Sequence, residues 1–492
     1  MPRDLGYQFV VALSDAIERA TAAFVREDAT AFRYRGVDLR HAVERSLYVA
    51  LVNHTPLYEA FRDERAPGDV AGLGSSLERA VATALLAAGA DLGSGRPRWR
   101  RLAGRARWQV RAVREGAGTG PAPTGEGPVA FVLDHVKFLR FVEPVRRRLG
   151  PAGDVIVSIV PPLTAAATAV GEDLVDLCGA PERAPRARAI GVGLLGARPL
   201  LGLYDGLLEA LVGRRPRCVV VVEGMSPVDE LANRAARSLG IPTLCLQQGW
   251  SPFVHAGFRN MSYAAMAVWG DGFADLLAPH NPGQRFAAVG SFTLAAEVDA
   301  GRDVLAAELD GRPAVAFFLQ PRSPLIRAEH QEALLALVAR TAQRLSGCAV
   351  LVREHPAAPL TEEDRRRVQG VGGVLVDPQR FSLGPVLEAS RAAVSIYSTS
   401  LVEAAALGSI PIVFNPTSMS RYSPDLDALG AGIEVRTPPD AEEAIARVVE
   451  DELLHRRLAV GVDAFRSRFF AAGGSPADAT VALIDDLAPA GG

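Results

Sequence analysis

The chain has 492 residues, enough for two or three domains, and 49% of them are hydrophobic, which suffices for large cores. Its formal net charge of −3 does not favour a nucleic-acid-binding protein, and its four cysteines lack the spacing of a zinc site or a disulfide framework. Without a signal-peptide pattern or an uncharged apolar run of the ~18–20 residues that span a bilayer, we expect a cytoplasmic protein.

Residues 1–115 are predicted to be largely helical, because they contain few β-branched runs. Within them, residues 96–114 hold eight arginines and no acidic residue, and their apolar side chains fall on one face of a helical wheel. Such a helix can lie on an anionic membrane surface, which would make the protein peripheral to the inner membrane. It can equally pack its apolar face on the rest of the protein. The glycine-rich stretch at 116–127 is predicted to be a flexible linker.

From residue 128 onward, short apolar runs alternate with helical patterns in two series. The first comprises Val129–Leu133, Val155–Val160, Cys218–Val222, Thr243–Leu246 and Ala265–Trp269, and the second comprises Ala314–Leu319, Ala349–Val352, Gly373–Val376, Ala393–Ile396 and Ile410–Phe414. Runs that are apolar on both faces and separated by helices indicate doubly wound parallel sheets. We therefore predict an α/β chain with two Rossmann-like domains facing a cleft, at 128–295 and 296–475, followed by a C-terminal helix and tail at 476–492.

The second series ends in polar side chains at the strand ends, where such sheets bind ligands. Arg353 and His355 point the same way along one strand, and Pro356 ends that strand. The helix predicted after Tyr397 opens with three hydroxyl residues, and the unpaired N–H groups of a helix N-terminus form an anion site. The pattern predicts a phosphate and nucleotide site formed by Gln320, Arg353, His355, Pro356, Ser398, Thr399, Ser400 and Glu403. The alternative for His355 is a histidine at a strand end that bonds only to a backbone carbonyl. The alternative for Gln320 is a glutamine that belongs only to a turn.

The first series ends in carboxylates. Asp134 follows the opening strand, and Glu223 closes the strongly apolar run that begins at Cys218. A carboxylate at a buried strand end is costly to desolvate, which raises its pKa and suits a general base or a nucleophile. Glu223 is the first candidate and Asp134 the second, although Asp134 could equally cap the next helix. His135, Gln248 and Trp250 are candidate contacts to an acceptor, whereas Asp229 and Glu230 are expected to be acids of a helix N-terminus.

Two segments resemble GT-B glycosyltransferases of bacterial surface-polysaccharide assembly. One runs from Asp229 through Gly240-Ile-Pro and Gln248-Gly249 to Val289-Gly-Ser291, and the other is the helix and strand at 398–413. Gln320-Pro321 and His355-Pro356 further resemble the QP and HP motifs of the β-Kdo transferases of capsule and lipopolysaccharide systems. HP recurs in CMP-sialic-acid transferases, whose acidic motif is matched only in its second half by Glu223-Gly224.

The resemblance implies a metal-independent transferase that moves Kdo, or a related ulosonic acid, from a CMP-activated donor to a glycan or glycolipid acceptor. It implies no further cofactor. In the related enzymes the HP histidine and the hydroxyls of the later helix contact the CMP phosphate, which carries over to His355 and residues 398–400. The nucleophile of the retaining enzymes carries over to Glu223, with Asp134 second. The alternatives are a nucleotide-diphosphate-sugar or CDP-glycerol transferase and a non-catalytic nucleotide-binding assembly partner.

Overall fold

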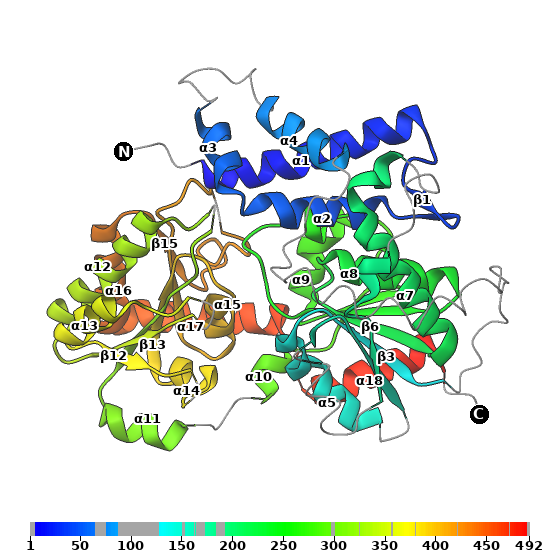
Figure 1. Cartoon of the computed structure of the whole chain (residues 1–492). Helices are drawn as coiled ribbons and strands as arrows, with labels where there is room; N and C mark the ends of the chain where they lie inside the picture. The colour runs from blue at the N-terminus through cyan, green and yellow to red at the C-terminus, as the bar shows by residue number, and fades with distance from the viewer. Residues whose placement is uncertain are drawn as a thin grey trace.

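Figure 1 shows the computed structural model of the chain. The structure describes residues 5–63, 75–86, 127–149, 153–161, 163, 173–183, 192–296, 301–323, 325–355, 358–378, 380–420, 422–471 and 473–489. Two parallel sheets, of seven and six strands, each carry helices on both faces, and further helices precede them. This confirms the predicted α/β fold with two Rossmann-like domains and a helical N-terminal region. The basic segment 96–114, the linker except Gly127, and Pro356 lie outside the described residues.

The first domain is built on the sheet with the strand order β5-β4-β3-β6-β7-β8-β9. The central strands β3 (Val129–Leu133) and β6 (Cys218–Val222) pair in parallel, and all their side chains are buried, so both faces of these runs had to be apolar. The other strands are β4 (Asp154–Ser158), β5 (Leu174–Asp176), β7 (Thr243–Leu246), β8 (Ala265–Val268) and β9 (Phe286–Ala288). Its main helices are α5 (Leu139–Leu149), α7 (Arg198–Arg214), α8 (Pro227–Ser238) and α9 (Asp271–Leu277).

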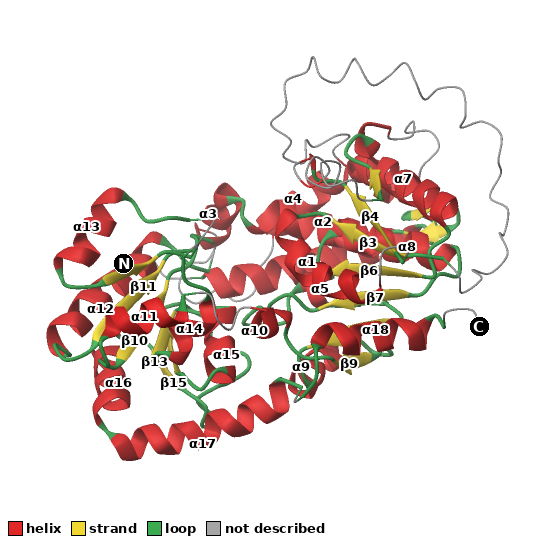
Figure 2. Ribbon diagram, turned by 90° about the horizontal axis from the view of Figure 1, so that it is seen from below, coloured by secondary structure: helices red, strands yellow, loops and turns green. Residues whose placement is uncertain are grey.

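The second domain repeats the arrangement with the strand order β12-β11-β10-β13-β14-β15. Its strands are β10 (Ala314–Phe318), β11 (Ala349–Arg353), β12 (Val374–Val376), β13 (Ser390–Ser395), β14 (Ile410–Phe414) and β15 (Ile433–Val435). Its helices include α12 (Ala328–Arg344), α13 (Glu362–Gly370), α14 (Leu383–Glu388), α15 (Thr399–Ala406) and α16 (Pro438–Glu450). Helices α10 (Phe292–Ala296) and α11 (Arg302–Leu309) follow the first sheet in the chain and precede the second. Figure 2 shows the two sheets side by side.

The N-terminal helices form a layer that contacts both domains (Figure 1). They are α1 (Gly6–Glu27), α2 (Arg40–Val52), α3 (Thr55–Asp63) and α4 (Ser75–Leu86), with an unpredicted hairpin of β1 (Arg33–Tyr34) and β2 (Val37–Asp38). Helix α2 packs on α8 of the first domain. Toward the second domain, the Ser418 hydroxyl donates to the Gln8 side chain at 2.8 Å, and the Arg327 guanidinium donates to the Tyr58 hydroxyl at 2.7 Å.

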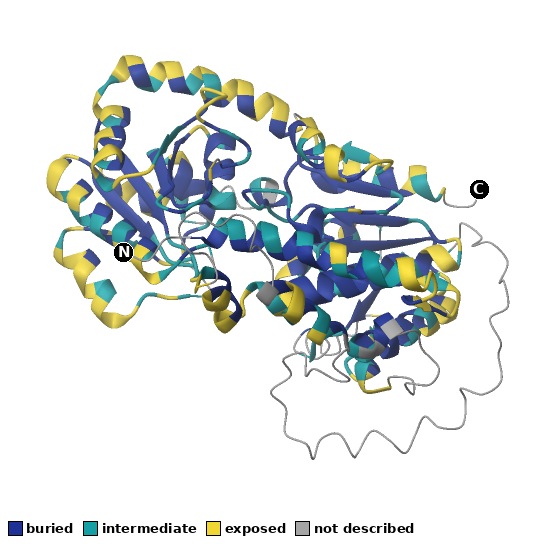
Figure 3. Cartoon of the chain, turned by 90° about the horizontal axis from the view of Figure 1, so that it is seen from above, coloured by how far each residue is buried: buried dark blue, intermediate teal, exposed yellow. Residues whose placement is uncertain are grey.

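The last two helices return the chain to the first domain. Helix α17 (Glu452–Phe469) contacts both α15 and α9, and α18 (Pro476–Leu487) packs on α5. Phe470 stacks on Trp269 with ring centroids 5.6 Å apart, which fixes this crossing to the end of β8. Figure 3 shows that both sheets are buried and that exposed residues concentrate on the outer helices. No helix within the described ranges is both long enough and apolar enough to cross a membrane.

Candidate functional site

The strand order reverses once in each sheet, and four of the predicted site residues follow the strands at these two points. The first reversal lies between β3 and β6, which lead to Asp134 and Glu223. The second lies between β10 and β13, which lead to Gln320 and Ser398. Doubly wound sheets bind ligands in the crevice outside the carboxyl ends of the strands at such reversals. These four residues therefore lie at the sheet edges where folds of this type bind ligands.

The Glu223 carboxylate contacts two polar side chains. One of its oxygens accepts a hydrogen bond from the Gln248 amide at 2.9 Å, and the other lies 3.8 Å from the Lys137 ammonium. Burial raises the pKa of Glu223, and the charge of Asp134 raises it further, whereas Lys137 and Gln248 act in the opposite direction. Its backbone has φ +78°, a conformation that is costly for a residue with a side chain and is common at functional sites.

Asp134 and Asp229 add two more carboxylates to the same corner. Burial raises the pKa of Asp134, and a hydrogen bond with the Ser226 side chain partly offsets this. Asp229 is fully buried, and burial together with the charges of Asp134 and Glu223 raises its pKa well above the usual value. Asp134 does not cap the following helical turn. That cap is His135, whose Nδ1 accepts from the Lys137 N–H at 3.0 Å.

Lys137 is the residue that sequence reasoning missed. It follows Asp134 by three positions and is the only lysine among the 53 basic residues of the chain. Besides pairing with Glu223, its charge lowers the pKa of His355, which belongs to the second domain. A single cation therefore acts on a carboxylate of one domain and on an imidazole of the other. Its uniqueness in an arginine-rich chain was the one signal that could have singled it out.

His355 lies just beyond the end of β11 and is half-buried. Burial lowers the pKa of its imidazole, and the Lys137 charge lowers it further. Both effects favour the neutral imidazole, which carries one N–H donor. Its neighbour Arg353 donates from Nη1 to the Phe381 carbonyl at 2.7 Å, so part of that guanidinium stabilises the second domain itself.

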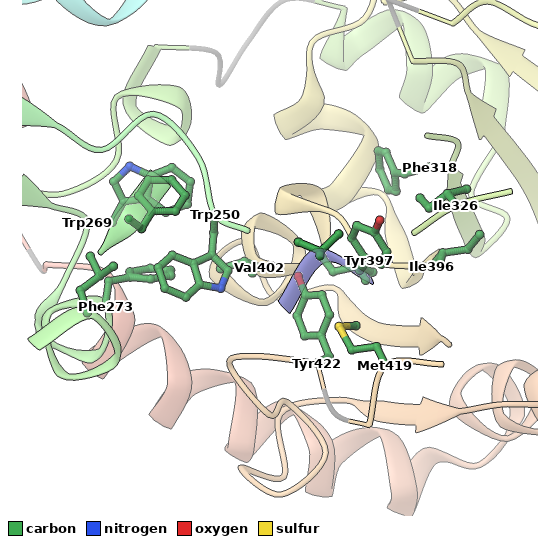
Figure 4. Close-up of a cluster of buried hydrophobic side chains, with 14 of the residues drawn as sticks. Trp250, Trp269, Phe273, Phe318, Ile326, Ile396, Tyr397, Val402, Met419 and Tyr422 are labelled. Carbon is green, nitrogen blue, oxygen red and sulfur yellow. The ribbon is translucent and has the colours of Figure 1, made fainter. Parts of the chain in front are cut away.

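The start of α15 is tied to the first domain by Thr399. The Thr399 hydroxyl accepts from the Trp250 N–H at 3.1 Å and donates to the Trp250 carbonyl at 3.2 Å. The Ser398 hydroxyl caps the helix by accepting from the Ser400 N–H at 3.1 Å, and the Tyr422 hydroxyl donates to the Ser398 carbonyl at 2.9 Å. Figure 4 draws Trp250 with Trp269 and Phe273 on one side of this region and Tyr397 with Tyr422 on the other.

Gln320 and Glu403 are both set into the second domain. The Gln320 side-chain oxygen accepts from the Tyr397 N–H at 3.1 Å and from the Ser395 hydroxyl at 3.3 Å, so it joins the ends of β10 and β13. Glu403 lies on the second turn of α15 and is buried. Burial raises the pKa of the Tyr422 hydroxyl, and the charge of Glu403 adds to this effect.

A small pocket lies beside Glu223. Apart from Glu223 and the amides of two glutamines, its lining is apolar. The other lining residues are Gln247, Gln248, Gly249, Trp250, Phe258, Met266 and Leu277. Among the residues that the structure describes, no group of three or more His, Cys, Asp and Glu side chains could hold a metal ion.

Comparison with known proteins identifies the fold. No family model matches the chain, and no curated protein matches it. A protein proposed to be a UDP-N-acetylglucosamine 2-epimerase, from Listeria monocytogenes, matches with a TM-score of 0.53 at 13% identity, over 73% of this chain and 96% of that one. The UDP-GlcNAc 2-epimerase from Neisseria meningitidis bound to UDP-GlcNAc gives 0.49 at 13% identity, over 73% and 99%. The calicheamicin glycosyltransferase CalG4 gives 0.44 at 17% identity, over 73% and 98%.

Only the first of these three scores exceeds 0.5. The first match agrees with the two strand orders, and together they identify the fold of the chain as GT-B.

Proposed function

We propose that the chain is a glycosyltransferase that takes Kdo, or a related ulosonic acid, from a CMP-activated donor and transfers it to a glycan or glycolipid acceptor. The observation that carries this proposal is the pairing of Glu223 with Lys137 at 3.8 Å, together with the effect of the Lys137 charge on His355 of the second domain. The choice of a CMP donor rests on the QP and HP pairs at Gln320 and His355. The Listeria match supports a nucleotide-sugar substrate only in general terms.

The second domain would hold the nucleotide. The neutral His355 imidazole donates its N–H to the phosphate of CMP. The Ser398 hydroxyl can donate its own proton to the same phosphate while its oxygen still accepts from Ser400, because a hydroxyl has one donor and two lone pairs. The Thr399 hydroxyl already donates to Trp250, so its contact to the phosphate would use the backbone N–H. Glu403 is the candidate acceptor for the ribose hydroxyls.

The first domain would supply the catalytic carboxylate. In the reaction, the anomeric carbon gains a bond to the acceptor oxygen and loses its bond to the phosphate oxygen, and CMP leaves with that electron pair. Glu223 can remove the proton of the acceptor hydroxyl, or it can first attack the anomeric carbon and be displaced by the acceptor in a second step. Both roles need an ionised carboxylate. The Lys137 ammonium favours that state and offsets the charge of the phosphate and the sugar acid.

An enzyme that acts on UDP-activated sugars is the second candidate, as a transferase or an epimerase. The Listeria match above is proposed to be a UDP-N-acetylglucosamine 2-epimerase, and the two carboxylates Asp134 and Glu223 would suit proton transfer at a sugar carbon. The two candidates differ in the nucleotide that the second domain binds.

Thermal unfolding in the presence of CMP, CDP, UDP or GDP separates these proposals. A ligand present at a hundredfold excess over its dissociation constant adds about 2.7 kcal/mol to the free energy of unfolding. We expect stabilisation by CMP, and release of CMP from CMP-Kdo when an acceptor is added. Stabilisation by UDP alone would favour the second candidate, and stabilisation by none of the four would favour a non-catalytic partner.

A further inference from the structure

The turn that carries Glu223 has an unusual backbone that depends on its surroundings. Glu223 and Gly224 both have φ +78°. For Glu223 this conformation is unfavourable unless neighbouring groups enforce it. A side chain at position 224 is excluded as well, because a Cβ there would lie 2.6 Å from the Cys245 sulfur. The direction of the Glu223 carboxylate therefore depends on the groups that hold this turn.

The turn is held by hydrogen bonds on both sides. On the amide side, an oxygen of Asp229 accepts from the N–H groups of Gly224, at 3.1 Å, and Ser226, at 3.2 Å. On the carbonyl side, the Tyr263 hydroxyl donates to the Gly224 carbonyl at 3.2 Å. Asp229 and Tyr263 are both buried, so water does not replace these bonds.

Arg45, from the N-terminal helix α2, directs the Tyr263 proton. Its guanidinium is 1% exposed, and its Nη1 lies 2.9 Å from a Glu230 oxygen and 3.3 Å from the Tyr263 hydroxyl. The arginine can only donate, so it occupies a lone pair of the Tyr263 oxygen. The single phenolic proton is then left for the Gly224 carbonyl. Glu230 has a second partner, Arg234, whose Nε donates to its other oxygen at 2.6 Å.

We propose that Arg45 and Tyr263 are positioning residues for Glu223, so that the N-terminal helical region forms part of the catalytic site. The proposal rests on the function proposed above, because it assumes that the Glu223 carboxylate reacts. It gives helix α2 (residues 40–52) a role in the first domain in addition to its packing on α8. The N-terminal helices then set the geometry of the turn in addition to covering the two domains.

Three variants of the full chain test this inference. Tyr263→Phe keeps the ring and removes only the hydroxyl, and Arg45→Met removes the guanidinium. Arg234→Met is the matched control, since it removes the other ion pair of Glu230 and leaves Tyr263 in place. The first readout is hydrogen–deuterium exchange of a peptide that covers residues 222–226. We expect exchange about tenfold faster in Tyr263→Phe, and wild-type exchange in Arg234→Met.

The second readout is transfer from the CMP-sugar, where we expect kcat of Tyr263→Phe to fall by about tenfold or more with the donor KM unchanged. Wild-type exchange in a folded Tyr263→Phe would overturn the inference, as would faster exchange with an unchanged kcat. If the wild-type chain transfers no sugar from any CMP donor, the proposed function fails. The exchange measurement would still decide whether Tyr263 holds the turn. Arg45→Met should also exchange faster than Arg234→Met, and wild-type exchange in a folded Arg45→Met would overturn the role of Arg45. If Arg45→Met does not fold, Tyr263→Phe still decides whether the Tyr263 hydroxyl holds the turn.

Discussion

The ammonium of Lys137 lies 3.8 Å from a carboxylate oxygen of Glu223, and its charge also lowers the pKa of His355 on the opposite domain. One cation thus links the proposed catalytic carboxylate to the proposed phosphate ligand. It favours the ionised form of the carboxylate and the neutral form of the imidazole, which are the forms that the proposed reaction requires.

Replacing Lys137 should change the pH dependence of transfer. Its charge lowers the pKa of Glu223, so Lys137→Met should raise that pKa, and a reaction that needs ionised Glu223 should then begin at a higher pH. We expect the acid limb of the kcat/KM profile to move to higher pH, measured as CMP release from pH 4 to 9. Arg140→Met, at an exposed position on the next helix, should leave the limb in place. An unmoved limb in Lys137→Met would contradict the assignment of the limb to Glu223.

The chain offers a direct chemical probe of the same residue, because Lys137 is its only lysine. Reductive methylation should modify two amines, the side chain of Lys137 and the α-amino group. We expect CMP, or a CMP-sugar, to slow the modification of Lys137 and to leave that of the α-amino group unchanged, which provides an internal control. Equal labelling with and without saturating nucleotide would show that the donor does not bind near Lys137.

Removing the Glu223 charge should abolish most of the activity without weakening nucleotide binding. For Glu223→Gln we expect turnover to fall by about 10²–10⁴, the usual contribution of a proton-transfer group, while the thermal shift with CMP is retained. The control is Glu209→Gln, at an exposed carboxylate on α7. Near-normal transfer by Glu223→Gln would move the catalytic role to Asp134.

His355→Ala should lower turnover by about 10²–10³, because it removes a donor to the leaving phosphate. His280→Ala, at an exposed histidine of the first domain, should have no effect. CMP release under single-turnover conditions distinguishes this chemical effect from weaker binding. A wild-type rate for His355→Ala would exclude the phosphate role.

Thr399→Val tests the bond between the domains. The change keeps the side-chain shape but leaves the N–H and carbonyl of Trp250 without their partner. We expect the free energy of unfolding to fall by about 1–3 kcal/mol in a urea titration, the usual penalty for an unsatisfied buried polar group. Ser467→Ala, which removes an exposed hydroxyl on α17, should change it by less than ~0.5 kcal/mol. A fall no larger than this control's would mean that water replaces the lost bonds.

Much of the fold was predictable, because the central strands must be apolar on both faces. The predicted runs at 129–133, 218–222, 243–246 and 410–414 coincide with β3, β6, β7 and β14. The edge strands β5, β9 and β15 escaped prediction, since each has only three residues and is only partly buried. The hairpin of β1 and β2 has two residues in each strand and carries no periodic pattern.

The site was predictable only in part, for a related reason. Asp134 and Glu223 stand out because each ends a long apolar run. Lys137 does not, because the effect of its charge on His355 arises between domains, and no local pattern encodes that effect. The same holds for Thr399, whose hydroxyl is used by Trp250, and for Arg45, which reaches the Glu223 turn through Tyr263. Contacts between distant segments depend on tertiary packing.

The most direct test is a crystal structure of the protein with CMP. We predict the phosphate within about 3 Å of the His355 imidazole and of the Ser398 hydroxyl, with Lys137 facing it from the first domain. A phosphate bound away from both His355 and the start of α15 would contradict the account.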